Sequence, residues 1–238
     1  QQASYAFDAF VEEVYPVMLR GGKVAIPEKG EVQDVALLAN FIARHSITLL
    51  DCSPLLLNEL NQYHLQEIGS LRIVISGGDA LKKEYITHLL DFARVYNTYG
   101  PTEATVTAAA HLDIDAANSV VIGRPIAHTQ AFILDRFLHP LPVGVPGELC
   151  IAGLGLARGY LNNPEATAAT IDADGWLHTG DIAVRDSDGC YSILGRSKDM
   201  FISGGENVYP AEIENVLLQH PAIADPAHSL GIASAAAL

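Results

Sequence analysis

Residues 32–96 alternate between helical and strand-like patterns, and this alternation limits the possible folds more than any other feature of the chain. In the helical segments apolar residues recur every three to four positions, whereas the strand-like segments are short apolar runs. Helical patterns cover residues 32–44, 54–60 and 81–94, and strand-like runs cover residues 47–50, 71–75 and 95–96. Such alternation predicts an α/β fold, with a parallel sheet and helices on its faces.

The pattern changes after about His111. Short strand-like runs at residues 131–134, 147–152 and 191–194 are separated by Pro, Gly and Asp, which predicts a β-rich subdomain. Gly195–Asp199 is polar and predicts a hinge, and an apolar-periodic helix is expected from Pro210 to about Gln219. We therefore expect an α/β subdomain over residues 1–110, a β-rich subdomain over residues 111–197, and a small second domain that begins within residues 198–238.

Charge and cysteine content exclude several functional classes. Lys and Arg number 14 against 28 Asp and Glu, giving a net charge of −14, and this field repels nucleic acid and anionic membranes. Cys52, Cys150 and Cys190 are scattered without CxxC spacing, so the spacing indicates neither a disulfide framework nor a zinc site. A reducing cytoplasm fits this pattern, and no apolar run approaches the roughly 18 residues of a membrane span.

The strongest local signal is the heptad Asn97–Glu103 (NTYGPTE), placed where a strand of the predicted sheet ends. Ligands of open α/β sheets bind at that edge. The segment offers an aromatic face, a hydroxyl and a carboxylate, which suit a planar base, a phosphate oxygen and a divalent cation. Gly-Pro also marks ordinary turns, so the heptad alone leaves a structural role open.

Other motifs accompany the heptad in a fixed order: Gly147–Gly153 with Gly155–Tyr160, Trp176–Asp181 (WLHTGD), and Gly195–Asp199 (GRSKD). Together they resemble the adenylate-forming superfamily of acyl-CoA synthetases, luciferases and peptide synthetase adenylation domains. The resemblance covers nearly the whole chain and fades after about Ala222. It implies that the β-rich part is a distorted barrel, that residues 1–197 are part of a large domain, and that a small C-terminal α+β domain follows.

The resemblance also implies roles for the residues in these motifs. Tyr99 would stack on adenine, Asn97 would bind its amino group, and Gly77, Gly78 and Gly100 would let backbone pass close to the nucleotide. Thr102 would contact the α-phosphate and Glu103 would hold Mg²⁺. Asp181 would accept both ribose hydroxyls, Arg196 would lie near the ribose and phosphates, and Lys198 would be the hinge residue.

The segment Phe7–Glu13 (FDAFVEE) resembles the peptide synthetase motif in which an aspartate, here Asp8, binds the α-ammonium group of the substrate. With Gly123–Ala127 and Leu134-Asp135 it favours an amino acid. The same resemblance places the remaining pocket wall at Ala9, Glu12, Leu55, Val74, Ser76, Thr98, Val106 and Thr107. Glu12 would pair with a cationic substrate side chain such as that of Lys or ornithine, or else point to solvent.

The resemblance thus implies ATP-dependent activation of an amino acid as an acyl-adenylate, for transfer to a phosphopantetheine thiol on a carrier protein. Lys198–Pro210 looks more like acyl-CoA ligases, as does Ile193 where peptide synthetases often carry Tyr. The alternatives are therefore an acyl- or aryl-CoA ligase, with CoA as acceptor, and a noncatalytic remnant. The sequence contains neither the family's upstream phosphate loop nor its late lysine, so we expect weak adenylation by this chain at most.

Overall fold

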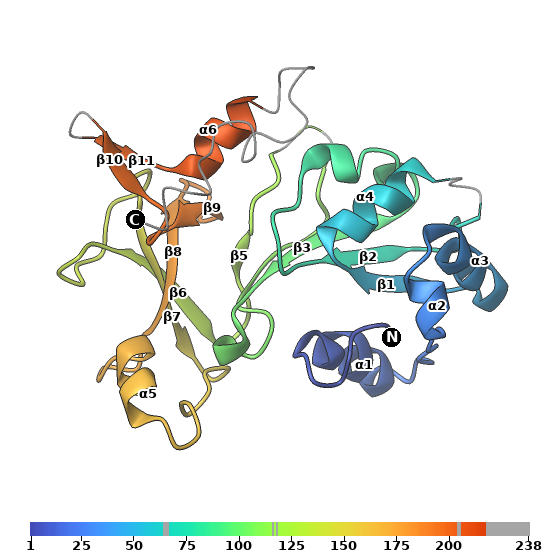
Figure 1. The fold of residues 1–238 in the computed structure, drawn as a ribbon, viewed down its shortest axis with the longest axis horizontal. Helices are drawn as coiled ribbons and strands as arrows, with labels where there is room; N and C mark the ends of the chain where they lie inside the picture. The colour runs from blue at the N-terminus through green and yellow to red at the C-terminus, as the bar shows by residue number, and fades with distance from the viewer. Residues whose placement is uncertain (64–66, 116, 118, 204–205, 218–238) are drawn as a thin grey trace. The chain divides into compact units, whose positions relative to one another are not determined.

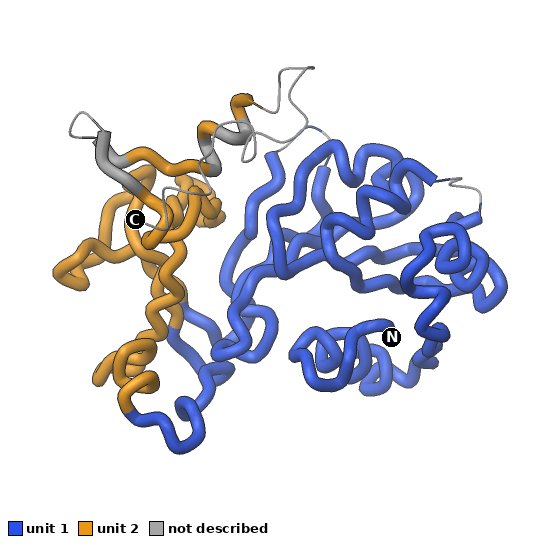
Figure 2. Tube along the Cα trace, in the orientation of Figure 1, with its two compact units in different colours: residues 1–130, 152–164 blue, residues 131–151, 165–238 orange. Residues whose placement is uncertain are grey.

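The computed structural model describes residues 1–63, 67–115, 117, 119–203 and 206–217. These residues form two compact units, one of residues 1–130 and 152–164 and the other of residues 131–151 and 165–238 (Figure 2). The glycine pair that follows the predicted hinge, residues 204–205, and the closing stretch from residue 218 lie outside the described residues. No helix of the described part is long and apolar enough to cross a bilayer.

The first unit contains a five-stranded sheet in the order β1-β2-β3-β4-β5 (Figure 1). Strands β1, β2 and β3 are parallel, whereas β4 and β5 continue the sheet in antiparallel pairings. The strands are β1 (Leu49–Cys52), β2 (Ile73–Ser76), β3 (Arg94–Tyr99), β4 (Ala109–His111) and β5 (Arg124–Pro125). The predicted parallel sheet is confirmed, and the heptad begins within β3, at the carboxyl end of that strand.

The two faces of this sheet pack against different helices. Leu50, Val74 and Val95 are neighbours in register on β1, β2 and β3. They pack into a core with α3 (Val35–His45) and α4 (Pro54–Gln62). Helix α1 (Ala9–Leu19) contacts β1, and Figure 1 shows it on the other side of the sheet from α4. Because successive strand side chains point to opposite faces, Asp51 lies on the side of β1 that faces away from this core. The short helix α2 (Lys29–Val32) precedes α3.

The predicted helix over residues 81–94 is replaced by two short 3₁₀ turns, η1 (Lys83–Tyr85) and η2 (Leu89–Asp91). The cause is the side chain of Asn61, which is 3% exposed. Its Nδ2 donates to the carbonyl oxygen of Glu84, and its Oδ1 accepts from the backbone N–H groups of His88 and Leu89. These backbone groups are satisfied by a side chain instead of by a continuous helix. The apolar spacing is still used, because Ile86 and Leu89 are fully buried.

The second unit is β-rich, as predicted. Its strands β6 (Thr129–Leu134), β7 (Gly147–Gly153), β8 (Leu177–Arg185) and β9 (Tyr191–Arg196) form a four-stranded sheet in chain order. The described strands form this open sheet and no closed barrel. Helix α5 (Pro164–Thr170), the hairpin of β10 (Phe201–Ser203) and β11 (Glu206–Val208), and α6 (Pro210–Leu217) complete the described elements, with η3 (Thr102–Ala104) in the first unit.

Candidate functional site

The loop after β3 brings together residues from distant parts of the first unit. Thr102 Oγ1 donates a 2.6 Å hydrogen bond to Asp8 Oδ2, and Asp8 Oδ1 accepts from the backbone N–H of Ala9 at the start of α1. The hydroxyl of Tyr160 donates to Glu103 Oε1, and the N–H of Ala157 donates to the Glu103 carbonyl oxygen at 2.7 Å. Two motifs that the sequence analysis singled out, the heptad and the glycine-rich segment, are therefore in direct contact.

Asn97 and Gly100 shape the strand end. Asn97 is 5% exposed and its Nδ2 donates to the Val121 carbonyl oxygen at 2.9 Å. This bond fixes the orientation of the amide, and Oδ1 is the atom that could accept from an amino group. A Cβ at Gly100 would lie 2.7 Å from the Ala108 backbone nitrogen, so only glycine fits there. Val106 nearby has a φ of 67°, a strained value for a β-branched residue.

A cavity of about 380 Å³ lies in the first unit beside α1 and β1. Of the predicted pocket residues, Asp8, Ala9, Glu12, Thr98 and Val106 line it, together with the predicted glycines Gly77, Gly78 and Gly100. A Cβ at Gly77 would lie 2.5 Å from Thr98 Oγ1, and Gly78 has a φ of +80°, so both positions favour glycine.

The remaining predicted pocket residues lie outside the lining. Val74 and Ser76 are fully buried, Val74 in the core and Ser76 donating from Oγ to the Cys52 carbonyl oxygen. Leu55 is 62% exposed, and its neighbour Leu56 lines the cavity instead. Thr107 is not in the lining but donates from Oγ1 to Glu12 Oε1 at 2.9 Å, which holds that carboxylate in place.

The cavity is acidic, and part of its charge was missed by the sequence analysis. Glu13 and Asp51 line it in addition to Asp8 and Glu12. Glu13 accepts from the backbone N–H groups of Gln2 and Ala3 at 3.0 Å. Asp51 was missed because it stands in an apolar run that continues the predicted strand, and only the position of α1 shows that its side of the strand is a cavity wall.

In this cavity the charged forms of Glu12 and Asp51 are disfavoured. Burial raises the pKa of Asp51 to about 8, and the charges of Glu12 and Glu13 add to this rise. Burial also raises the pKa of Glu12, with Asp8 and Glu13 contributing, although the hydrogen bond from Thr107 opposes the rise. Oδ2 of Asp51 is buried and has no hydrogen-bond partner among the described residues. A cation would stabilise both ionised carboxylates.

Other predicted residues lie in the second unit. Asp181 on β8 is 8% exposed, and its Oδ1 is 3.0 Å from Nε of Arg196, its register partner on β9. Arg196 also donates from Nη1 to the Thr179 carbonyl oxygen at 3.0 Å. Lys198 lies two residues beyond Arg196, in the turn that follows β9. These residues belong to the second unit, whereas the loop after β3 and the cavity belong to the first.

Comparisons with known proteins assign the family. The family model described as AMP-binding enzyme matches residues 1–161. The chain belongs to the AMP-binding enzyme family. This assignment confirms the resemblance to adenylate-forming enzymes that the motifs indicated.

Relatives of this AMP-binding enzyme chain are much longer proteins. Bacitracin synthase 2 of Bacillus licheniformis is 42% identical over 229 residues, which are 92% of this chain and 9% of that protein. A dimodular nonribosomal peptide synthase of Bacillus subtilis is 36% identical over 92% of this chain and 10% of its own length. The chain thus spans about a tenth of these two curated relatives.

A solved structure shares the fold of the AMP-binding enzyme chain. The amide bond synthetase McbA from Marinactinospora thermotolerans superimposes with a TM-score of 0.76 at 28% sequence identity. The match covers 86% of this chain and 42% of that protein.

Proposed function

We propose that this chain belongs to an enzyme that activates an amino acid with ATP as an aminoacyl-adenylate, and that a carrier-protein phosphopantetheine thiol then accepts the acyl group. The observation that carries the proposal is the 2.6 Å contact between Asp8 and Thr102. In an α-amino acid one carbon separates the ammonium group from the carboxylate that reacts. A carboxylate for the ammonium and a hydroxyl for the phosphate must therefore lie next to each other, as these two do.

In the first step of the proposed reaction, a substrate carboxylate oxygen attacks the α-phosphorus of ATP, and the bond from that phosphorus to the bridging oxygen breaks to release pyrophosphate. In the second step the thiol attacks the acyl carbon and AMP leaves, while the thiol proton passes to solvent or base. Neither step needs a covalent intermediate on the protein, so catalysis consists of positioning and electrostatic stabilisation. When the substrate ammonium group binds Asp8, the single Thr102 hydroxyl proton turns from Asp8 to the phosphate. Tyr99 and Asn97 Oδ1 bind the base, and Asp181 binds the ribose.

Mg²⁺ fits this site through Glu103. The Glu103 carboxylate lies in the loop after β3 and is oriented by the Tyr160 hydroxyl. Mg²⁺ prefers one or two carboxylates together with phosphate oxygens and water. When bound, Mg²⁺ would offset charge on the phosphates. Arg196 would add a positive charge beside Asp181, and rotation near Lys198 would bring the small domain to the thiol-transfer step.

The substrate that fits the cavity carries a positively charged side chain, as for Lys or ornithine. Glu12 and Asp51 are half-buried carboxyl groups of the same cavity, and burial together with the neighbouring carboxylates raises the pKa of both. A bound ammonium group would relieve this repulsion and replace the lost hydration.

The test is amino-acid-dependent exchange of labelled pyrophosphate into ATP, by this chain extended with the segments that flank it in its relatives. We expect exchange with lysine or ornithine and much less with norleucine, which has a side chain of similar length without the charge. Exchange with a neutral amino acid alone would overturn the side-chain proposal but keep the reaction. Exchange only with fatty or aryl acids would overturn the amino-acid proposal in favour of an acyl- or aryl-CoA ligase.

A further inference from the structure

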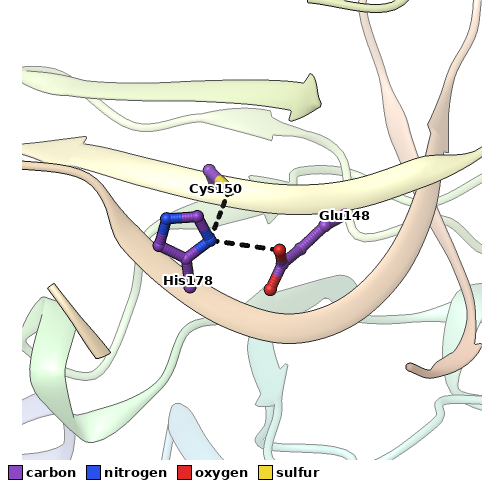
Figure 3. Close-up of side chains that lie close together, drawn as sticks. All are labelled: Glu148, Cys150 and His178. Carbon is purple, nitrogen blue, oxygen red and sulfur yellow. Dashed lines mark hydrogen bonds and ion pairs between the residues drawn. The ribbon is translucent and has the colours of Figure 1, made fainter. Parts of the chain in front are cut away.

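A second cluster of chemically active side chains lies in the second unit, on the β7–β8 pair. Glu148 and Cys150 stand two residues apart on β7, and His178 is the register partner of Cys150 on β8. Figure 3 shows both β7 side chains directed at one nitrogen of the imidazole. Nδ1 of His178 lies 3.1 Å from Glu148 Oε2 and 3.6 Å from Cys150 Sγ.

This single ring nitrogen cannot serve both neighbours at once. If Nδ1 carries a proton, it donates to the Glu148 carboxylate and offers nothing to the Cys150 thiol proton. If it lacks the proton, it accepts from the thiol and its lone pair faces the carboxylate oxygen. A positive ion between the three atoms satisfies all of them together, because thiolate, imidazole and carboxylate each offer a lone pair.

The separations fit a tetrahedral metal centre. Zinc bonds of about 2.3 Å to sulfur, about 2.0 Å to nitrogen and about 2.0 Å to oxygen place tetrahedral ligands about 3.3–3.6 Å apart. The two measured separations, 3.1 and 3.6 Å, lie close to these values, and all three ligand atoms lie within 4.8 Å of one another. We propose that Glu148, Cys150 and His178 bind a thiophilic divalent cation of the zinc class, with water in the fourth position.

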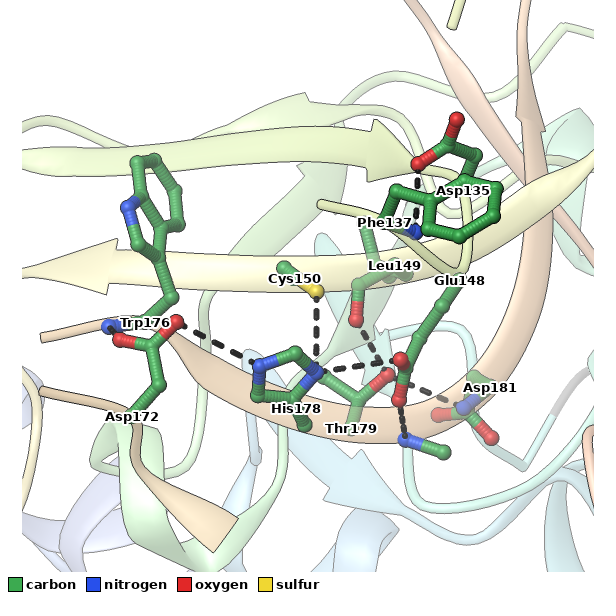
Figure 4. Close-up of polar contacts among 11 residues, drawn as sticks. Asp135, Phe137, Glu148, Leu149, Cys150, Asp172, Trp176, His178, Thr179 and Asp181 are labelled. Atoms are coloured by element: carbon green, nitrogen blue, oxygen red, sulfur yellow. Dashed lines mark hydrogen bonds and ion pairs between the residues drawn. The ribbon is translucent and has the colours of Figure 1, made fainter. Parts of the chain in front are cut away.

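The surroundings of the cluster support this assignment. Oδ2 of Asp172 faces the other imidazole nitrogen at 3.5 Å (Figure 4), the carboxylate–histidine arrangement that orients histidine ligands of metals. Glu148 uses Oε2 toward the cluster and Oε1 to accept from the Gly180 N–H at 3.2 Å, so binding leaves that hydrogen bond intact. The side chains of Glu148 and His178 are 31% and 23% exposed, which gives an ion access.

Metal binding releases protons from two of the ligands, Cys150 and His178. Burial, with the charges of Glu148 and Asp172, raises the pKa of the Cys150 thiol to about 12, so the thiol is neutral without metal. Sulfur–metal bond formation sends this proton to solvent. Burial disfavours the His178 imidazolium, but contacts with Glu148 and Asp172 outweigh it and raise that pKa, so His178 also loses a proton when it ligates. Affinity therefore rises with pH.

Cobalt(II) is the probe, because it replaces zinc in tetrahedral sites and shows a thiolate-to-cobalt absorption band. Titration of this chain with Co²⁺ should produce the band, and Zn²⁺ should abolish it by displacement. Cys150→Ser and Cys150→Ala should both lose it, whereas the matched variant Cys190→Ser, at a cysteine outside the cluster, should keep it. Asp172→Asn should keep the band and weaken binding about 10- to 100-fold.

Two outcomes would overturn the proposal: no thiolate band in the folded wild-type chain, or a band that survives in Cys150→Ala and disappears in Cys190→Ser. Circular dichroism of each variant separates lost binding from lost folding, and His178→Asn gives a second ligand variant that leaves the buried cysteine untouched. The measurement needs neither ATP nor an amino acid. Failure of the proposed adenylation would therefore leave its result unchanged.

Discussion

Asp8 and Thr102 are 94 residues apart in the sequence, yet they share a 2.6 Å hydrogen bond. One oxygen of the aspartate also accepts from the first turn of α1, so its orientation is fixed from two sides. A substrate ammonium group would find this carboxylate already placed beside the loop that follows β3. Such preorganisation lowers the entropy lost when the substrate binds.

Removal of the Asp8 charge should weaken amino-acid binding selectively. Asp8→Asn keeps the shape but loses a charge-assisted contact of about 1.5–3 kcal/mol, so KM for the amino acid should rise about 10- to 100-fold. KM for ATP should change little, because Asp8 would not contact the nucleotide. Steady-state pyrophosphate exchange in the extended protein measures both constants, with Asp91→Asn at the exposed end of η2 as control. Equal rises in both KM values would contradict the role given to Asp8.

Substrate binding should depend on pH through Asp51. The carboxyl group has a pKa of about 8, so it is mostly neutral at about pH 7 and mostly charged at about pH 9. A cationic side chain stays charged over this range and binds the ionised form better. KM for lysine should therefore fall about tenfold across it, following the ionised fraction. The charges of Glu12 and Glu13 also raise this pKa.

Two controls isolate the Asp51 effect. Norleucine should show a flat KM over the same pH range, because it has no side-chain charge. Asp51→Asn should flatten the profile for lysine and leave KM high. A profile for lysine that stays steep in Asp51→Asn would assign the titration to another group.

The loop after β3 should tolerate no side chain at Gly100. A Cβ there would lie 2.7 Å from the Ala108 nitrogen, and backbone cannot move aside as a flexible side chain can. Gly100→Ala should lower the free energy of unfolding by about 1–3 kcal/mol. Gly30→Ala is the matched control, since a Cβ at Gly30 meets nothing within 4 Å. Urea unfolding of both variants would show whether the effect is specific to Gly100, and equal midpoints would refute it.

Asn61 should be essential for the segment between β2 and β3. Asn61→Leu keeps the branching at Cγ but leaves the N–H groups of His88 and Leu89 and the Glu84 carbonyl without their side-chain partner. We expect a loss of at least about 2 kcal/mol in the free energy of unfolding, measured in urea. Asn58→Leu, on the partly exposed side of α4, should change it far less. Unchanged stability of Asn61→Leu would show that water or a local shift replaces these bonds.

The sequence predicted the parallel strands because short apolar runs alternate with helical patterns along the chain. In the structure every second residue of β1 and β2 is buried. It predicted a helix over residues 81–94 wrongly, since Asn61 comes from a different segment and no local pattern announces its hydrogen bonds. The long strand β8 was missed as a strand, because Thr179, Gly180 and Asp181 interrupt its apolar alternation.

The sequence likewise predicted only some of the candidate site residues. Motif residues such as Asp8, Thr102 and Glu103 were found from their resemblance to family motifs, and the structure adds how they contact one another. Asp51 and the Glu148–Cys150–His178 cluster were not found, because they depend on a helix lying over a strand and on two strands in register. Cysteine spacing alone argued against a zinc site, because the cluster contains only one of the three cysteines. Its other two ligands are a glutamate two residues away on the same strand and a histidine on the neighbouring strand.

The two faces of the first-unit sheet have different roles. The face toward α3 and α4 holds the apolar core, whereas the cavity with Glu12 and Asp51 lies on the side of α1. Substitutions of Glu12 or Asp51, which lie outside the core cluster, therefore leave the core packing untouched. In evolution, and equally in protein engineering, substrate preference in this fold can diverge by single changes while the scaffold that holds the reacting groups stays the same.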